Sequence, residues 1–159
     1  MIHAIKHIPD VSIKIITKGE IFETTSRKIS DEKKIIIFGV PGAFTSTCSK
    51  QHLPSYINLS DKLRDKGLND IYCLAVNDPY VMKVWQKQYK QGHKVKMIAD
   101  GNAELTKALE LDQDFSSNFM GLRSKRFALI AINSNIISLN IEEPGKYEVS
   151  SAEYMINKL

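Results

Sequence analysis

IIIFGVPGAFTSTC, residues 35–48, decides the fold, because it joins a continuous apolar run to a cysteine through a proline and a glycine. The run Ile35–Phe38 is predicted to be a buried strand, which Pro41 and Gly42 end. Cys48 then falls just past the carboxyl end of the strand, at the expected start of a helix. Free backbone N–H groups and the helix dipole favour negative charge there. The position therefore favours the thiolate, which is the nucleophilic form of cysteine.

Apolar patterns along the rest of the chain predict strands that alternate with helices. The further strands are expected at 11–16, 71–76, 95–99, 126–132 and 136–141, with a turn at 133–135 between the last two. Helices are expected from about 45–47 to 66 with a kink or break at Pro54, from 79 onward, at 104–111 and at 151–159. This order predicts an α/β protein with a central mixed sheet flanked by helices, as in a thioredoxin-like fold. No linker or repeat divides the chain, so residues 1–159 are expected to form one domain.

The size and charge of the chain limit the classes of protein to which it can belong. The chain has 159 residues, 43% of them hydrophobic, and a formal net charge of +4. No apolar run is long enough for a membrane span, and no nucleic-acid-binding motif accompanies the basic residues. The lysines that cluster between Lys83 and Lys96 are interpreted as a solvated helix face rather than a surface that steers anions.

The two cysteines, Cys48 and Cys73, are too few for a disulfide scaffold. A reducing intracellular compartment is therefore expected. The first seven residues lack the apolar core of a secretory signal and the Arg/Ser-rich character of a transit peptide. The expected location is the cytoplasm, or a mitochondrion or plastid if a presequence has been removed.

Residues around Cys48 suit thiol chemistry. Pro41 stiffens the loop, and Gly42 lets the backbone approach a ligand closely. Thr45 lies three residues before Cys48, on the same side of a helical turn, so its hydroxyl is expected to reach both the thiolate and an incoming oxygen. Arg123 and Arg126 are the candidates for a further positive charge.

The spacing Pro41-x-x-x-Thr45-x-x-Cys48 resembles the active-site signature of peroxiredoxins. The longer stretch 38–45, followed by Cys48-Ser49 and by the residues at 52–54, looks like the type II, or atypical, plant-like subfamily. Similar blocks occur at 76–82, 99–102 and 121–127, so the resemblance covers nearly the whole chain. It implies a thioredoxin-like fold and a thiol-dependent peroxidase acting on hydrogen peroxide and organic hydroperoxides, with no metal, haem, flavin or other cofactor.

The resemblance also assigns roles. Cys48 would be the peroxidatic cysteine, which becomes a sulfenic acid. Thr45 would hydrogen-bond the thiolate and the peroxide, Pro41 would shield the site, and Arg126 would be the catalytic arginine. Gly42, Phe44 and Thr47 are the expected substrate contacts. Two positions depart from the family pattern: Ser46 stands where proline is common, and Ser55 where glycine is common.

Cys73 is the only other thiol that could resolve the sulfenic acid. It matches a cysteine sometimes proposed as resolving in plant-like enzymes. Its apolar strand predicts that it is buried and distant from Cys48, and a disulfide needs Cα atoms within roughly 7 Å. A one-cysteine cycle is therefore favoured, with glutathione and glutaredoxin or thioredoxin as the reductant. A two-cysteine cycle through Cys73 remains the alternative.

Other residues admit more than one interpretation. His52 is favoured as a structural hydrogen-bond partner over a catalytic base, and Cys48 with His52 falls short of a metal site. Phe44, Tyr80 and Phe119 are expected either in the core or at a pocket mouth or dimer interface, and a homodimer is expected from the subfamily. Rival functions on the same fold are a thiol–disulfide oxidoreductase, disfavoured because Cys-x-x-Cys is absent, and a non-catalytic redox or binding module.

Overall fold

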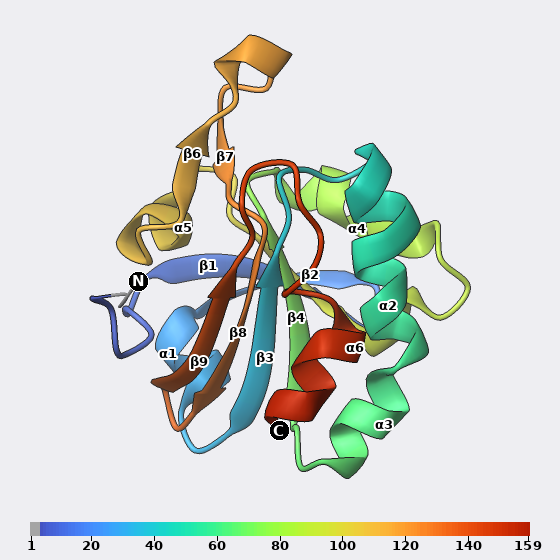
Figure 1. Cartoon of the computed structure of the whole chain (residues 1–159), viewed down its shortest axis with the longest axis vertical. Helices are drawn as coiled ribbons and strands as arrows, with labels where there is room; N and C mark the ends of the chain where they lie inside the picture. Colours follow the sequence, from blue (N-terminus) through green and yellow to red (C-terminus); the bar gives the residue numbers. More distant parts are fainter. Residues whose placement is uncertain (1–3) are drawn as a thin grey trace.

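A seven-stranded mixed sheet forms the centre of the protein (Figure 1). The structure, a computed structural model, describes residues 4–159, so the first three residues of the amino-terminal stretch considered above lie outside it. The strands are β1 Ser12–Thr17, β2 Glu20–Thr25, β3 Lys34–Gly39, β4 Asp70–Ala75, β5 Lys96–Ala99, β8 Phe127–Ile132 and β9 Asn135–Ile141, in the order β2-β1-β5-β4-β3-β8-β9. The three middle strands, β5, β4 and β3, are parallel, and the outer pairs are antiparallel. The predicted mixed sheet flanked by helices is confirmed.

Helices cover both faces of the sheet, because its central strands are apolar on both sides. In β3, Ile36 and Phe38 enter one core cluster, and Ile35 and Ile37 enter the other. The first cluster lies under α2 Leu53–Asn58, α3 Ser60–Asp65, α4 Pro79–Lys87 and α6 Ala152–Met155, and the second under α1 Ser26–Ser30 and α5 Glu104–Ala108. Within residues 4–159, no helix has both the length and the apolarity that crossing a membrane requires.

Gly39, the last residue of β3, gives the active-site loop its starting point. A Cβ at this position would lie 2.0 Å from the ring of Phe127, the first residue of the antiparallel neighbour β8. Only a residue without a side chain fits there, so the ring packs directly on the strand end. The close packing fixes where β8, and the arginine just before it, meets the end of β3.

Two hairpin elements were not predicted from the sequence. β2 is a partly exposed edge strand that follows the turn at Lys18-Gly19, and it leads into the short helix α1. The short strands β6 Asp112–Asp114 and β7 Leu122–Ser124 pair with each other and project from the body of the protein (Figure 1). The helix expected at 104–111 ends at Ala108, and Glu110 adopts a left-handed backbone conformation.

The helix expected from about residue 45 to 66 is divided into three parts. A π-helical turn, Cys48–His52, comes first and is followed by α2 and α3, which meet at Leu59. Pro54, which lacks an N–H, lies in the first turn of α2, directly after the π-helical turn. The irregularity predicted at Pro54 is therefore found one turn earlier, as the π-helical turn. Gly67 ends the segment with a φ of +99°, as predicted.

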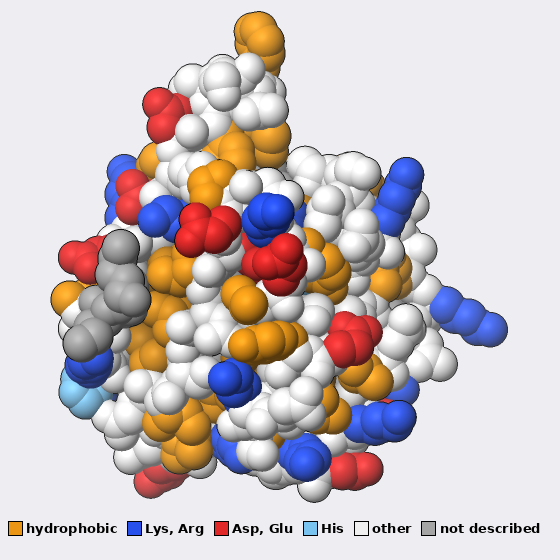
Figure 2. All heavy atoms as spheres, viewed as in Figure 1, with side chains coloured by type: hydrophobic (Ala, Val, Ile, Leu, Met, Phe, Trp, Pro, Cys, Tyr) orange, Lys and Arg blue, Asp and Glu red, His pale blue; other side chains and the backbone are white. Residues whose placement is uncertain are grey.

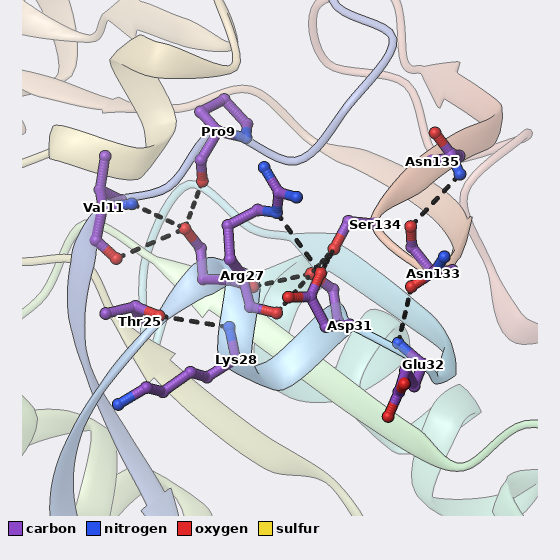
Figure 3. Close-up of polar contacts among 12 residues, drawn as sticks. Pro9, Val11, Thr25, Arg27, Lys28, Asp31, Glu32, Asn133, Ser134 and Asn135 are labelled. Carbon is purple, nitrogen blue, oxygen red and sulfur yellow. Dashed lines mark hydrogen bonds and ion pairs between the residues drawn. The ribbon is translucent and has the colours of Figure 1, made fainter.

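Polar side chains tie α1 to the turn between β8 and β9 (Figure 3). The Ser134 hydroxyl donates to Asp31, and the Asn133 side chain accepts from the backbone N–H of Glu32. These bonds lie at the end of the sheet away from the carboxyl end of β3. They stabilise the fold at that end of the sheet, and they do not involve the loop after β3.

Candidate active site

Cys48 begins the π-helical turn and is fully buried. The loop that carries it is held at both sides. The Val40 N–H donates to the Leu74 carbonyl of β4, and the Ala43 N–H donates to Asn77 Oδ1 at 2.9 Å. The turn itself is held by α4, because Trp85 Nε1 in this helix donates to Ser49 Oγ at 3.0 Å. The position of the thiol is therefore fixed by the hydrogen bonds that its loop and its turn make with β4, Asn77 and α4.

Arg126 is the arginine that contacts the thiol. Its Nη2 lies 3.2 Å from Cys48 Sγ, and its Nη1 donates to His52 Nδ1 at 2.9 Å. Arg123 instead donates to the carbonyls of Met120 and Pro41. The guanidinium that contacts the thiol thus comes from the residue just before β8, and Arg123 holds the loop.

His52 is a neutral hydrogen-bond partner of Arg126. Its Nε2 lies 3.0 Å from the Ser150 carbonyl, which can only accept, so Nε2 carries the proton and Nδ1 accepts from Arg126. Burial, and after it the charge of Arg126, lowers the pKa of His52 from 6.5 to about 3, although the Ser150 hydrogen bond opposes the shift. With Nδ1 occupied, His52 is not free to act as a general base. The predicted structural hydrogen bond is confirmed.

The lowered pKa of His52 makes stability depend on pH. Between pH 6.5 and about 3 the unfolded chain binds a proton at this site and the folded chain does not. The folding equilibrium constant should therefore fall by up to about tenfold per pH unit as the pH drops through this window. Urea titrations from pH 7 to 4 on the wild type and on His52→Gln measure the effect. The difference between the two proteins should carry this slope, and parallel curves would contradict it.

The Thr45 hydroxyl donates to the Gly42 carbonyl at 2.7 Å, rather than to the Cys48 thiol as expected. Its oxygen keeps its acceptor capacity, which can receive a peroxide O–H. A cavity of about 450 Å³ opens beside this hydroxyl, between the loop after β3, the β6–β7 projection and residues 142–146. The residues of the motif that line it are Pro41, Thr45, Ser46 and Thr47, and Arg126 lines it as well.

Of the three expected substrate contacts, Gly42 and Phe44 are not among the residues that line this cavity. Gly42 packs against Arg123, since a Cβ at Gly42 would lie 2.6 Å from a guanidinium nitrogen. Phe44 is 53% exposed with a left-handed backbone, and its ring faces that of Trp85. Neither residue lines the cavity, whereas Thr47 does.

Cys73 lies in β4, paired in register with Phe38, and its predicted burial is confirmed. Burial, and after it the charge of Cys48, raises the pKa of the Cys73 thiol well above its ordinary value. The two cysteines belong to the same core cluster. Both are free thiols.

Three aromatic side chains with open interpretations are exposed in the structure. Tyr80 is 73% exposed and Phe119, at the end of the β6–β7 projection, is 99% exposed, so the core interpretation is wrong for both and for Phe44. Trp85 is buried. Within the described residues, no group of three or more His, Cys, Asp or Glu side chains is placed to hold a metal ion.

Several contacts of the site were missed by sequence reasoning. The Ser150 carbonyl accepts from both His52 and Tyr56, and the Glu142 carboxylate binds the segment that carries Ser150. Tyr89 donates to the Ser49 carbonyl at 2.6 Å. No local pattern indicated the contacts of Ser150, because its bonds to His52 and Tyr56 join positions more than 90 residues apart.

Comparisons with known proteins agree with this geometry. The family model described as Redoxin matches residues 5–156. Peroxiredoxin-2D of Arabidopsis thaliana is 42% identical over 153 residues, which cover 96% of this chain and 94% of the relative. Peroxiredoxin-2C of Oryza sativa subsp. japonica is 50% identical over 127 residues, which cover 80% of this chain and 78% of the relative. The crystal structure of reduced Prx3 in complex with H₂O₂ from Vibrio vulnificus superimposes with a TM-score of 0.92, at 40% identity and 99% coverage of each chain.

Proposed function

The chain belongs to the peroxiredoxin family of thiol-dependent peroxidases, and from this premise we propose that it reduces hydrogen peroxide and organic hydroperoxides through a sulfenic acid at Cys48. The observation that carries the proposal is the 3.2 Å contact between Arg126 Nη2 and the buried Cys48 Sγ. A guanidinium at this distance is placed to stabilise negative charge on the reacting atoms. The Vibrio vulnificus relative, solved in complex with H₂O₂, supports hydrogen peroxide as a substrate.

In the proposed reaction the Cys48 thiolate attacks one peroxide oxygen. An S–O bond forms, the O–O bond breaks, and the leaving oxygen takes a proton and departs as water or an alcohol. Arg126 stabilises the negative charge that moves from sulfur to the leaving oxygen. The Thr45 oxygen accepts the peroxide O–H and orients the O–O bond, and Pro41 shields the site at the cavity wall.

The cycle we propose uses one cysteine. Cys73 is buried in β4, and its raised pKa keeps it as a poorly nucleophilic thiol. An external thiol must therefore attack the sulfenic acid, with glutathione and glutaredoxin or thioredoxin as the reductant. Because Cys48 is fully buried, the turn Cys48–His52 has to open before such a thiol can reach the sulfur.

A homodimer is proposed from the exposed apolar side chains near the site. Phe44, Tyr80 and Val84 are each more than half exposed, and hydrophobic atoms also cover the tip of the β6–β7 projection (Figure 2). A second copy would bury such a surface. Tyr80→Glu is expected to weaken the dimer by at least about tenfold, because a charge would have to be buried. Sedimentation equilibrium measures this, and an unchanged dimer would show that the patch serves another purpose.

We also propose a reducing intracellular location, in the cytoplasm or in a mitochondrion or plastid. The two free cysteines support it, because neither takes part in a disulfide.

Stopped-flow mixing of the reduced protein with hydrogen peroxide tests the proposed function. The expected result is a fast reaction that depends linearly on peroxide concentration and consumes one thiol. A Cys48 thiol that reacts no faster than a free cysteine would contradict the proposal.

A further inference from the structure

One oxygen of the Glu142 carboxylate binds four hydrogen-bond donors. Glu142 follows β9 directly and is buried. Its Oε2 accepts from the backbone N–H groups of Glu148, Val149 and Ser150 at 2.7, 2.9 and 3.0 Å, and from the Ser150 hydroxyl at 2.7 Å. Charge-assisted bonds of this kind are stronger than neutral ones. The chain from 142 to 150 is therefore closed into a loop whose end is fixed at Ser150.

The fixed end of this loop faces the active site. The Ser150 carbonyl accepts from His52 Nε2 at 3.0 Å and from the Tyr56 hydroxyl at 2.7 Å, all within the buried interior. His52 in turn accepts from Arg126 at its other ring nitrogen, and the Glu142 N–H donates to the Arg126 carbonyl at 2.9 Å. Glu142 thus holds Arg126 at its backbone and, through two intermediate residues, at its guanidinium.

We propose that Glu142 is a positioning residue of the peroxidase reaction, whose carboxylate fixes Ser150 so that Ser150 orients His52, and His52 orients the Arg126 guanidinium beside Cys48. The inference rests on the roles proposed above for Cys48 and Arg126. Arginine has a long side chain with many rotamers, so its direction has to be set by contacts. With one guanidinium nitrogen held by His52, the other is directed at the sulfur, and small errors in such placement slow a reaction strongly.

A direct electrostatic effect of the Glu142 charge would change the rate in the opposite direction to a positioning effect. The negative charge of Glu142, which lines the cavity, disfavours negative charge on the reacting atoms, so removing it would speed the reaction. Loss of positioning slows the reaction instead. The direction of the change in rate therefore separates the two effects.

A double-mutant cycle between Glu142 and Arg126 tests the proposal. The second-order rate constant with hydrogen peroxide is measured by stopped flow for Glu142→Ala in the wild type and in Arg126→Gln. In the wild type the constant is expected to fall about tenfold, and in Arg126→Gln by less than about twofold, because the residue through which Glu142 acts is gone. Glu142→Gln should recover most of the rate, since its side-chain carbonyl accepts the same N–H bonds.

Glu148→Gln is the matched control. It removes the same charge from the same loop, but its side chain is exposed and its backbone N–H still donates to Glu142. Its rate constant should stay within about twofold of the wild type. Urea titrations establish that each variant is folded, and Glu142→Asp, which is one methylene shorter, replaces Glu142→Ala under the same criterion if the latter does not fold.

Equal reductions in the two backgrounds, no reduction in the wild type, or a faster reaction would overturn the positioning role. A wild-type protein that does not react with peroxide would contradict the proposed function instead. The two failures are therefore distinguishable.

Discussion

The Cys48→Ser variant is expected to lose peroxidase turnover by at least about a thousandfold, because a serine hydroxyl is not ionised near neutral pH and does not attack peroxide. Cys73→Ser is expected to keep most of the activity, since the Cys73 thiol is buried and held protonated. The measurement is peroxide consumption with saturating external thiol, made on both variants and the wild type.

Folding controls make this comparison decisive. Cys48 and Cys73 belong to the same core cluster, so serine at either position places a polar group in the interior. The Cys73→Ser variant should lose more stability to urea than Cys48→Ser, because the Arg126 guanidinium contacts only position 48. A folded but inactive Cys73→Ser protein would overturn the one-cysteine cycle, and a turning-over Cys48→Ser protein would remove Cys48 from the reaction.

Arg126→Gln is expected to lower the rate constant with peroxide by about a hundredfold or more, which is the reduction typical of removing one preorganised donor from a transition state. Without the guanidinium, neither Cys48 Sγ nor His52 Nδ1 keeps its charged hydrogen-bond donor. Stopped-flow mixing with peroxide under pseudo-first-order conditions gives the constant, and a urea titration establishes the folded fraction.

Arg123→Gln is the comparison for that experiment. It removes a guanidinium from the same region, but one that binds the Pro41 and Met120 carbonyls and not the thiol. Its rate should fall far less. Equal reductions in the two variants would show that positive charge in the region matters and that the contact with sulfur does not.

The part of the fold that could be predicted is the part with strong local patterns. The runs at 35–40 and 71–76 are apolar throughout, and the structure buries them as the parallel strands β3 and β4. Asp78-Pro79 predicted a helix start, and the Asp78 side chain caps α4 by accepting from two backbone N–H groups. The turn at Asn133-Ser134 is typical of polar residues that can bond their own backbone, and both have positive φ.

The missed elements have weak local signals. β2 is a polar edge strand with no fully buried residue, and its pairing with β1 is a tertiary effect that overrides composition. β6 and β7 have three residues each, too few for a period to be recognised. The π-helical turn adds one residue to a helical turn before Pro54, and the hydrophobic pattern does not distinguish it from a regular helix.

The candidate site divides in the same way. Pro41 and Thr45 are near in sequence, so their spacing was enough to predict that they lie together, and both line the cavity. The resemblance to peroxiredoxins favoured Arg126 over Arg123. In the structure, the contact of Arg126 with the sulfur depends on where β8 begins beside Gly39. The Glu142 and Ser150 contacts needed the structure, because they depend on how the chain returns after β9.

Mass spectrometry after the addition of one equivalent of hydrogen peroxide to the reduced protein tests the central claim most directly. The prediction is a single added oxygen on the peptide that contains Cys48, trapped as a sulfenic acid, with Cys73 unmodified. A bridge between Cys48 and Cys73, or oxidation of Cys73 with Cys48 left as a free thiol, would contradict it.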